Sequence, residues 1–461
     1  MVWGGDVGPL SFFFFSQPGC GPLLALVLCG VRLVLLDTTL DLEGLRPEYS
    51  GRFRCIGAAC EDSCCTGWSV YFDRESCEKY ERLPDGPLKV LIAAHVTPVP
   101  ADVPGSLPAR FAKVQLTEKH ACPFLDAEKL CRIQAEHGEA YLSTTCATYP
   151  RMVNRIEGAE EKALALSCPE AARLVLLTPD LLGAGRERHR SWQDNAEMIP
   201  LDRDEPLRGP VAMKAYFWPM REFVLGLLTN RGYALWQRLF LLGVFTRRMG
   251  ALARGELDRG FLTVLREFDT AVDSGALRGA MEAIPADLNV QLDLVLRLAG
   301  LRLARTHIGQ RFLDTIEEFK RGIGNGPGST METLIGCYGE AHDRWYEPFM
   351  REHPHVMENL LVNAVFRSLF PFGAKAGELN AAPDMEREFA LLVSYFALMK
   401  GLLIGVAGCY REEFGAEHVV RTVQAAAKHF EHHPGFLDEA YALLAASGLD
   451  NARGLTMLVR N

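Results

Sequence analysis

The 461-residue sequence lacks most of the patterns from which a function is usually assigned. It contains no internal repeat of fixed period, which argues against a solenoid fold. Its 49 lysines and arginines are outnumbered by 58 acidic residues, so the formal net charge is −9. A general nucleic-acid-binding protein needs a basic surface that displaces counterions from phosphate, so we expect no nucleic acid among its partners. No spacing of serine, histidine and acidic residues defines a catalytic triad, and the catalytic and cofactor-binding residues stay unassigned.

Two familiar metal-binding signatures are also missing among the 13 cysteines. None of them forms the Cys-x2-Cys pair that is usual in zinc sites. The Cys-x3-Cys-x2-Cys motif of radical S-adenosylmethionine enzymes is incomplete, because Cys60 and Cys64 are followed by Gly67 where the third cysteine belongs. That class of enzyme is therefore excluded.

What the sequence does contain is a concentration of cysteines in its first third. Eight of them lie in short, ordered contexts: Cys55, Cys60, Cys64, Cys65, Cys122, Cys131, Cys146 and Cys168. Thiolates are strong ligands for zinc and for iron-sulfur clusters, so these eight are predicted to bind metal. Disulfides are the least favoured alternative, because the adjacent Cys64 and Cys65 do not readily pair with each other. The spacing Cys-x4-Cys-x3-Cys-Cys favours an iron-sulfur cluster over zinc.

The distribution of cysteines also indicates a compartment. Thirteen is an odd number, and a disulfide-stapled secreted protein is normally small and evenly bridged, so we expect a reducing environment and a cytoplasmic location. Leu23–Leu36 is strongly apolar, but it carries Arg32 and is shorter than a bilayer span. It also lacks a preceding basic residue and a following cleavage site, so membrane attachment is not expected. Residues 1–42 are interpreted as an N-terminal extension of doubtful origin.

The remaining sequence predicts a mainly α protein, in which a small cysteine-rich metal-binding α+β module is followed by a helical domain. The module is assigned to residues 43–182, a polar linker to 183–210 and the helical domain to 211–461. Within the module we expect a strand at Trp68–Phe72, helices at Ser76–Leu83 and Gln134–Tyr141, and an irregular loop at Val96–Pro108. Apolar residues at helical spacing predict further helices at Ala171–Leu177, Met213–Leu228, Tyr233–Ala253, Leu257–Val272, Asp287–Ile308, Gln310–Arg321, Thr330–Tyr346, His355–Phe370, Met385–Ala407, His418–His432 and Gly435–Ala446.

Three further features have a functional and a plain interpretation. Gly322–Gly328 superficially matches a nucleotide-binding turn, but an amphipathic helix precedes it, so a loop between helices is favoured. The residues Trp68, Tyr71, Asp73, Tyr141 and Tyr149 could hold a sulfonium or an alkylammonium group, yet packing or capping of the small module is favoured for each. His429, His432 and His433 are interpreted as a solvated helix end.

The cysteine contexts resemble the flagellin lysine N-methylase family. The resemblance is carried by Phe53-Arg-Cys55, the run from Cys60 to Trp68, Asp73, Cys122-Pro-Phe-Leu125, Leu130-Cys-Arg-Ile-Gln134, the run from Tyr141 to Arg151, Leu166-Ser-Cys-Pro-Glu170, Met357–Asn363 and Leu369-Phe-Pro-Phe372. It extends from about Leu45 to about Leu437. The cysteine core also resembles a broader group of zinc- or iron-chelating domains. Cys77, at a position where we expect a non-ligand residue such as tyrosine, and residues 1–42 depart from the family pattern.

The resemblance implies methyl transfer from S-adenosylmethionine to lysine side chains of flagellin in the bacterial cytoplasm. It further implies an iron-sulfur cluster as a prosthetic group, with zinc as the alternative. A non-catalytic iron-sulfur or zinc-binding protein is the competing interpretation. In a third, the metal only folds the small module so that the helical body can bind a partner.

Overall fold

A computed structural model of the chain describes residues 49–100, 110–156, 159–182, 197–199, 209–256, 260–304, 308–373, 376, 382–433 and 435–461. These residues belong to one compact unit, Leu45–Asn461. The predictions for residues 1–42, including the apolar run Leu23–Leu36, lie outside the described residues, and so does most of the predicted linker 183–210.

The cysteine-bearing part combines short helices with two small sheets. In chain order it contains α2 (Tyr49–Arg52), the 3-10 helix η1 (Gly57–Ala59), β1 (Tyr71–Phe72), α3 (Arg74–Glu81), α4 (Pro87–His95), β2 (Val96–Pro98), β3 (Ala112–Val114), α5 (Arg132–His137), the 3-10 helix η3 (Glu139–Tyr141), α6 (Thr144–Thr148), β4 (Arg151–Ile156), β5 (Ala159–Leu164), α7 (Pro169–Leu177) and β6 (Glu197–Ile199).

The rest of the described chain is helical. It contains the 3-10 helix η4 (Gly209–Tyr216), α8 (Phe217–Thr229), α9 (Leu235–Ala253), α10 (Phe261–Asp273), α11 (Arg278–Glu282), α12 (Leu288–Leu303), α13 (Gln310–Gly322), α14 (Met331–Ala341), the π-helical η5 (His342–Tyr346), α15 (Glu347–Glu352), α16 (His355–Arg367), α17 (Met385–Tyr410), the 3-10 helix η7 (Arg411–Glu413), α18 (Ala416–Phe430), α19 (Phe436–Ala446) and α20 (Ala452–Met457). The predicted class, mainly α, is confirmed.

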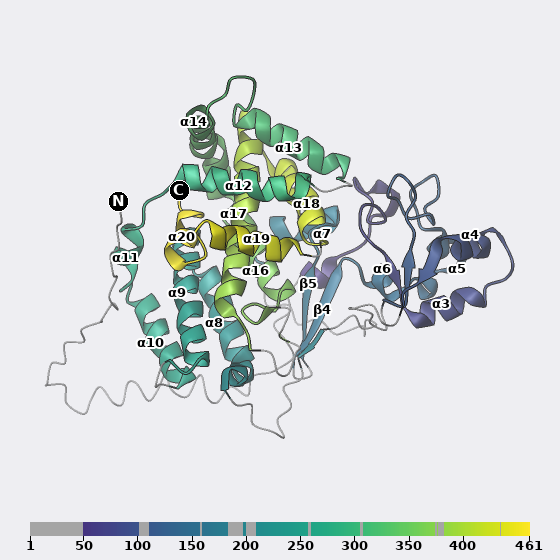
Figure 1. Cartoon of the computed structure of the whole chain (residues 1–461), viewed down its shortest axis with the longest axis horizontal. Coiled ribbons are helices and arrows are strands. Elements are labelled where there is room, and N and C mark those ends of the chain that lie inside the picture. The colour runs from purple at the N-terminus through teal and green to yellow at the C-terminus, as the bar shows by residue number, and fades with distance from the viewer. Residues whose placement is uncertain are drawn as a thin grey trace. The chain divides into compact units, whose positions relative to one another are not determined.

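Helix α17 forms the centre of the helical part. Almost all of its side chains are buried, and α9, α12, α13, α14, α16, α18 and α19 pack against it. Figure 1 shows this helix running between its neighbours. Of the helices in the described residues, it alone is long and apolar enough to cross a membrane, and its apolar stretch is entirely enclosed by the rest of the protein. It is therefore placed as a core helix.

Helices α13 and α17 approach each other so closely that glycine is required at the crossing. A Cβ atom at Gly322 would overlap the carbonyl oxygen of Gly405. A Cβ atom at Gly408 would lie 2.5 Å from the carbonyl oxygen of Gly322. Because real Cβ atoms do not come this near to backbone oxygens, any larger residue at Gly322 would separate the two helices.

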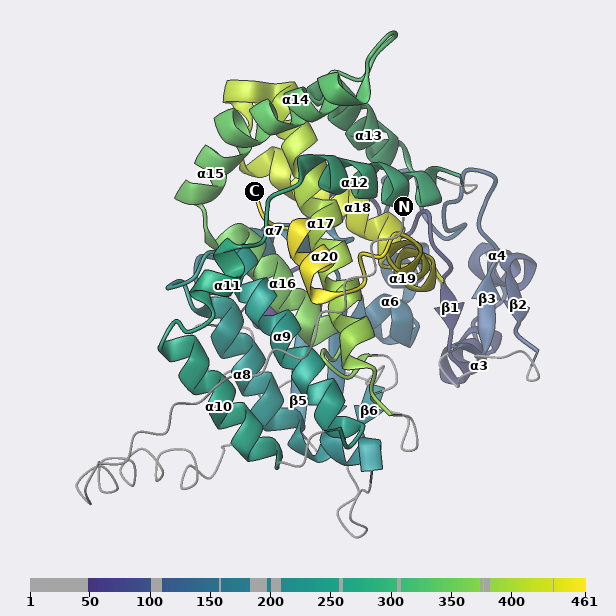
Figure 2. The ribbon, with the colours of Figure 1, turned by 60° about the vertical axis from the view of Figure 1, so that its left-hand side comes forward.

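A separate, smaller hydrophobic core supports the cysteine-rich segment. Its buried residues are Val70, Phe72, Tyr80, Leu83, Leu88, Ile92, Val114, Cys122, Phe124 and Ile133. The antiparallel sheet β1-β3-β2 forms one part of it, and Figure 2 shows α3 and α4 beside these strands. The residues of α2, β5 and α7 that are buried belong instead to the large core of the helical part. The border between the two cores therefore lies nearer to α6 than to the predicted module end at residue 182.

Helix α16 joins the cysteine-bearing part to the helical part through two asparagines. The side-chain amide of Asn363 donates to the Leu164 carbonyl oxygen at 2.9 Å, and its oxygen accepts from the Tyr49 hydroxyl at 2.6 Å. The Asn359 amide donates to the Val175 carbonyl oxygen at 2.9 Å. These buried amides satisfy backbone and hydroxyl groups that would otherwise lack partners, so they fix β5 and α7 against α16.

The second sheet contains a fully buried ion pair. Strand β4 pairs antiparallel with β5 and parallel with β6, in the order β5-β4-β6. The Glu161 carboxylate on β5 accepts from the Arg221 guanidinium on α8 at 2.7 and 2.8 Å, and both side chains are 0 % exposed. Arg221 also donates to the Phe370 carbonyl oxygen at 2.7 Å. The pair ties the sheet to the helical part.

Several predictions about local structure require correction. Residues Val96–Pro98, predicted as irregular loop, form strand β2, and the hairpin of β4 and β5 was not predicted. The predicted helix Gln134–Tyr141 is interrupted at Gly138, where φ is 85°, and only α5 and η3 flank the break. The prediction for Gly322–Gly328 is confirmed, because this segment joins α13 to α14.

Candidate functional site

Five of the eight predicted metal ligands gather at the small core. We call Cys64, Cys65, Cys122, Cys131 and Cys146 the thiol cluster. Cys122 is part of that core, and Cys65, Cys131 and Cys146 pack against it. The sulfur of Cys64 lies 3.8 Å from that of Cys65.

Backbone pairing explains how segments distant in sequence bring these thiols together. The Cys122 amide donates to the Cys65 carbonyl oxygen at 2.7 Å, and the Gly67 amide donates to that of His120 at 2.9 Å. Cys131 pairs with Leu125 in an isolated antiparallel bridge. The loop around Cys65, the segment before Cys122 and the start of α5 therefore converge.

Capping interactions fix the position of Cys146 in the first turn of α6. The Ser143 hydroxyl caps this helix by accepting from the Cys146 amide at 3.3 Å. Asp73 caps α3 by accepting from the Ser76 amide at 2.8 Å, and it also accepts from the Thr144 amide at 2.8 Å. One carboxylate thus joins the starts of two helices, which confirms the capping interpretation of Asp73.

The thiols of the cluster influence one another's ionisation. The hydrogen bond with Cys65 and the positive charge of Lys428 lower the pKa of Cys64 to about 7, and the same hydrogen bond together with burial raises the pKa of Cys65. Burial raises the pKa of Cys122 to about 11 and that of Cys146 to about 12. Each thiol that ionises therefore makes ionisation of its neighbours harder.

The other three predicted ligands, Cys60, Cys168 and Cys55, are not part of the thiol cluster. Cys60 and Cys168 interact electrostatically with each other and with Cys64, and burial raises the pKa of Cys168 to about 12. Cys55 is exposed and interacts with the Arg151 guanidinium. The structure thus gathers six of the other seven predicted ligands around Cys64 and leaves Cys55 at the edge.

The donor chemistry of this group fits a soft metal ion. Buried thiols resist ionisation, and bound zinc or iron would stabilise their thiolates. In the part of the chain that the structure describes, however, no three Cys, His, Asp or Glu side chains have the arrangement of metal ligands. The eleven cysteines there are free thiols. The assignment of the eight ligands therefore stays a prediction.

A lysine of α18 holds the cysteine-bearing loop against the helical part. The Lys428 ammonium donates to the two Asp62 carboxylate oxygens at 2.9 and 2.8 Å, to the Ser63 carbonyl oxygen at 2.9 Å and to the Thr66 hydroxyl at 3.1 Å. The Gln424 amide donates to Asp62 at 2.8 Å. We call these contacts the Lys428 anchor. They place the loop that carries Cys60, Cys64 and Cys65 against α18.

An aromatic stack lies next to this anchor. The Trp68 ring stacks on Tyr149 at 5.6 Å and on His432 at 5.1 Å between ring centroids. The Ser167 hydroxyl lies 2.7 Å from His432 Nε2 and 3.0 Å from the Tyr149 hydroxyl. For Trp68 and Tyr149 the packing interpretation is thus confirmed. The interpretation of His429 and His432 as a solvated helix end is wrong, because His429 is 4 % exposed and His432 is half-buried in this stack.

A large cleft opens between the Cys60–Gly67 loop, α13 and α18. Its volume is about 630 Å³, within the usual range of small-molecule sites. Charged side chains of both signs line it: Glu61, Asp62, Lys119, Arg311, Asp314, Arg421 and Lys428. We call it the α13–α18 cleft.

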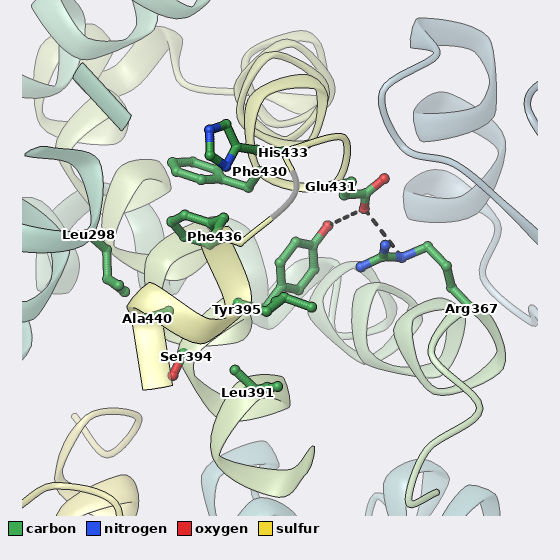
Figure 3. Close-up of a pocket in the computed structure, with 11 residues that line it drawn as sticks. Leu298, Arg367, Leu391, Ser394, Tyr395, Phe430, Glu431, His433, Phe436 and Ala440 are labelled. Carbon is green, nitrogen blue, oxygen red and sulfur yellow. Dashed lines mark hydrogen bonds and ion pairs between the residues drawn. The ribbon is translucent and has the colours of Figure 1, made fainter. Parts of the chain in front are cut away.

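A smaller pocket lies at the C-terminal end of α18 (Figure 3). Its volume is about 60 Å³ and its walls are mostly apolar. Inside it, the Tyr395 hydroxyl donates to Glu431 at 2.8 Å, and the Arg367 guanidinium lies 3.6 Å from the same carboxylate. The Glu431 side chain is 3 % exposed. This pocket is too small for a nucleoside, but it presents a carboxylate and a hydroxyl in apolar surroundings.

Sequence reasoning did not identify the partners that α18 and the residues just after it supply. Lys428, Gln424 and His432 lie more than 250 residues after the segments they contact. In the sequence, lysine and glutamine at helical spacing cannot be distinguished from the polar face of an ordinary amphipathic helix. The only local signal was the resemblance of the Ser167-Cys168 segment to the family.

Comparisons with known proteins define the class. The family model of the FliB lysine N-methylase C-terminal domain matches residues 221–458. "Lysine-N-methylase" from Salmonella typhimurium is 24 % identical over 361 residues, which cover 76 % of this chain and 84 % of that protein. The protein of the same name from Salmonella choleraesuis is 23 % identical over the same shares. "Flagellar biosynthetic protein FliU" from Salmonella muenchen is 28 % identical over 149 residues, 32 % of this chain and 85 % of that protein.

The family and the names of the first two relatives place the chain in a methyltransferase class. No solved structure matches the chain significantly. Because the family model covers more than half of its length, the chain belongs to the FliB lysine N-methylase family, and the resemblance seen in its cysteine contexts is confirmed.

Proposed function

We propose that this methyltransferase transfers a methyl group from S-adenosylmethionine to lysine side chains of flagellin. Membership in the lysine N-methylase family supports the acceptor residue. The flagellar name of the third relative supports the substrate protein. A cytoplasmic location follows from this proposal, since a filament subunit would be modified before its export.

The proposal includes an iron-sulfur cluster held by the thiol cluster with Cys60 and Cys168, with zinc as the alternative. The convergence of these thiols from five separate segments supports it. When bound, such a group would cross-link the segments that form the small core, which has few long elements of its own. Methyl transfer itself needs no metal, so the protein contributes positioning of the reactants.

The acceptor lysine must be neutral before it attacks the methyl carbon. An apolar surrounding lowers the pKa of an amine, and a carboxylate can accept its proton. The pocket of Figure 3 combines apolar walls with Glu431 and Tyr395, so we assign the acceptor side chain to it. Glu431→Gln is expected to lower kcat at neutral pH and to restore part of the activity at high pH, whereas unchanged kcat at every pH would contradict the assignment.

The main test is methyl incorporation from labelled S-adenosylmethionine into purified cognate flagellin by anaerobically prepared protein. We expect incorporation by the natural chain and its loss in Cys60→Ser and Cys146→Ser. Cys337→Ser on α14, outside the thiol cluster, is the matched control and is expected to retain activity. Metal-loaded, folded protein that incorporates no methyl group would contradict the proposal and favour a non-catalytic metal-binding protein.

A further inference from the structure

We propose that the α13–α18 cleft binds the amino-acid end of S-adenosylmethionine, and that Arg311 pairs with its carboxylate. This inference rests on the proposed function and adds the position of the donor within it. The donor carries a carboxylate, an ammonium group and a sulfonium in a short chain, so its site needs charges of both signs. The α13–α18 cleft has both and, unlike the pocket of Figure 3 with its Arg367 and Glu431, it is large enough for the donor.

The dimensions of the cleft suit a ligand of this size. Its volume of about 630 Å³ lies within the range of sites that enclose small molecules, about 300–1,000 Å³. The pocket of Figure 3, at about 60 Å³, is far below that range. The cleft is also bordered by the loop between Cys60 and Gly67, so a ligand there would lie close to the thiol cluster.

Two of the four lysines and arginines that line the cleft already have a protein carboxylate as partner. Lys428 binds Asp62 in the Lys428 anchor, and Arg421 pairs with Glu318. Each of these side chains is held in place by its partner, so neither is left to receive a carboxylate from a ligand.

Arg311 differs from these two cations, and unlike the exposed Lys119 it is half-buried. Within the described part of the chain its guanidinium makes no hydrogen bond and no ion pair, and its Nε atom, like that of Arg421, is buried without a partner. Buried polar atoms are normally satisfied, so an unpaired guanidinium at a cleft wall indicates a partner that comes from outside the chain. Arginine presents parallel N–H groups that match a carboxylate in two hydrogen bonds.

Acidic side chains beside Arg311 complete the recognition of a zwitterion. Glu61 and Asp62 interact electrostatically with Arg311, and Asp314 lies one turn further along α13. Asp314 accepts from the Gln310 amide at 2.8 Å and retains further acceptor capacity. An ammonium group next to the bound carboxylate would find an acceptor here, whereas a simple dianion such as phosphate would be repelled.

The test compares two ligands that differ only in this portion. S-adenosylhomocysteine has the amino-acid end, and 5′-methylthioadenosine has the same nucleoside and sulfur without it. Arg311→Ala is expected to raise the Kd of S-adenosylhomocysteine by about 10- to 100-fold, the loss of a charge-assisted hydrogen-bonded pair. The Kd of 5′-methylthioadenosine should change less than twofold. Arg297→Ala, an exposed arginine of α12 paired with Asp293, is the matched control and should change neither.

Arg311→Lys separates geometry from charge and guards against misfolding. It keeps the positive charge but loses the two parallel N–H groups, so we expect an intermediate Kd for S-adenosylhomocysteine with an unchanged thermal midpoint. An Arg311→Ala protein that binds S-adenosylhomocysteine as tightly as the natural chain would overturn the inference, as would equal weakening of both ligands. A natural chain that binds neither ligand and methylates nothing would instead overturn the proposed function.

Discussion

The Lys428 anchor gives the sharpest structural prediction, because one ammonium group makes most of the contacts that join the cysteine-bearing loop to α18. The side chains of Lys428 and Asp62 are 11 % and 19 % exposed, so solvent screens their attraction only in part. Removing one member of a buried pair costs about 3–5 kcal/mol, and an exposed pair contributes about 0–1 kcal/mol. For this partly buried pair we expect Lys428→Met to lower the free energy of unfolding by about 2–3 kcal/mol.

A double-mutant cycle with Asp62→Asn isolates the pair from the other contacts of each residue. We expect a coupling energy of about 1–2 kcal/mol from urea unfolding of the four proteins. Hydrogen exchange of the amides from Cys60 to Gly67 should also become faster in Lys428→Met, since the loop loses its attachment. A coupling energy near zero with unchanged exchange would refute the role of this contact.

Three other substitutions test separate parts of the account. Gly322→Ala should lower the free energy of unfolding by about 2–3 kcal/mol because α13 must move away from α17. Gly336→Ala, where a Cβ meets nothing within 4 Å, is the control and should raise the free energy of unfolding by about 0.5–1 kcal/mol. Equal effects of the two substitutions in a urea titration would contradict the close crossing. Burial lowers the pKa of His429 to about 4. As pH falls, the His429 imidazole is therefore protonated in the unfolded chain before it is protonated in the folded one. The free energy of unfolding should consequently fall as pH decreases from about 6.5 to 4. His429→Gln should make the urea midpoint depend less on pH across this range. An unaltered pH dependence would be evidence against the role assigned to His429. Glu161→Gln should cost about 3–5 kcal/mol because it leaves the Arg221 guanidinium buried without a counter-charge, and a thermal midpoint equal to that of the natural chain would disprove this.

The sequence predicted the helices well wherever an apolar face repeats at helical spacing. The segment predicted as Met385–Ala407 is α17, Met385–Tyr410, since a long apolar run can be satisfied only in the core. The strands were harder to predict. The hairpin β4–β5 carries Glu161 and Lys162 in positions that look solvent-exposed, and only the distant Arg221 explains how a carboxylate is buried there.

The same distinction between local sequence patterns and long-range contacts applies to the candidate site. The cysteines could be singled out because their chemistry is rare and their spacing is local. The anchor and the cleft depend on contacts such as Lys428 with Asp62, across more than 360 residues, and nothing in either local sequence specifies the other. Arg311 had no signal at all, because an arginine in the first turn of an amphipathic helix is commonplace and its lack of a partner is visible only in three dimensions.

The central claim is that thiols from separate segments of the chain converge on iron, or on zinc. Its most direct test is the content of iron, acid-labile sulfide and zinc, with the visible spectrum, in protein purified without exposure to oxygen. The account predicts a brown protein with iron and sulfide in equal amounts, both lost in Cys146→Ser and retained in Cys337→Ser. Colourless, folded and active protein that contains neither iron nor zinc would contradict it.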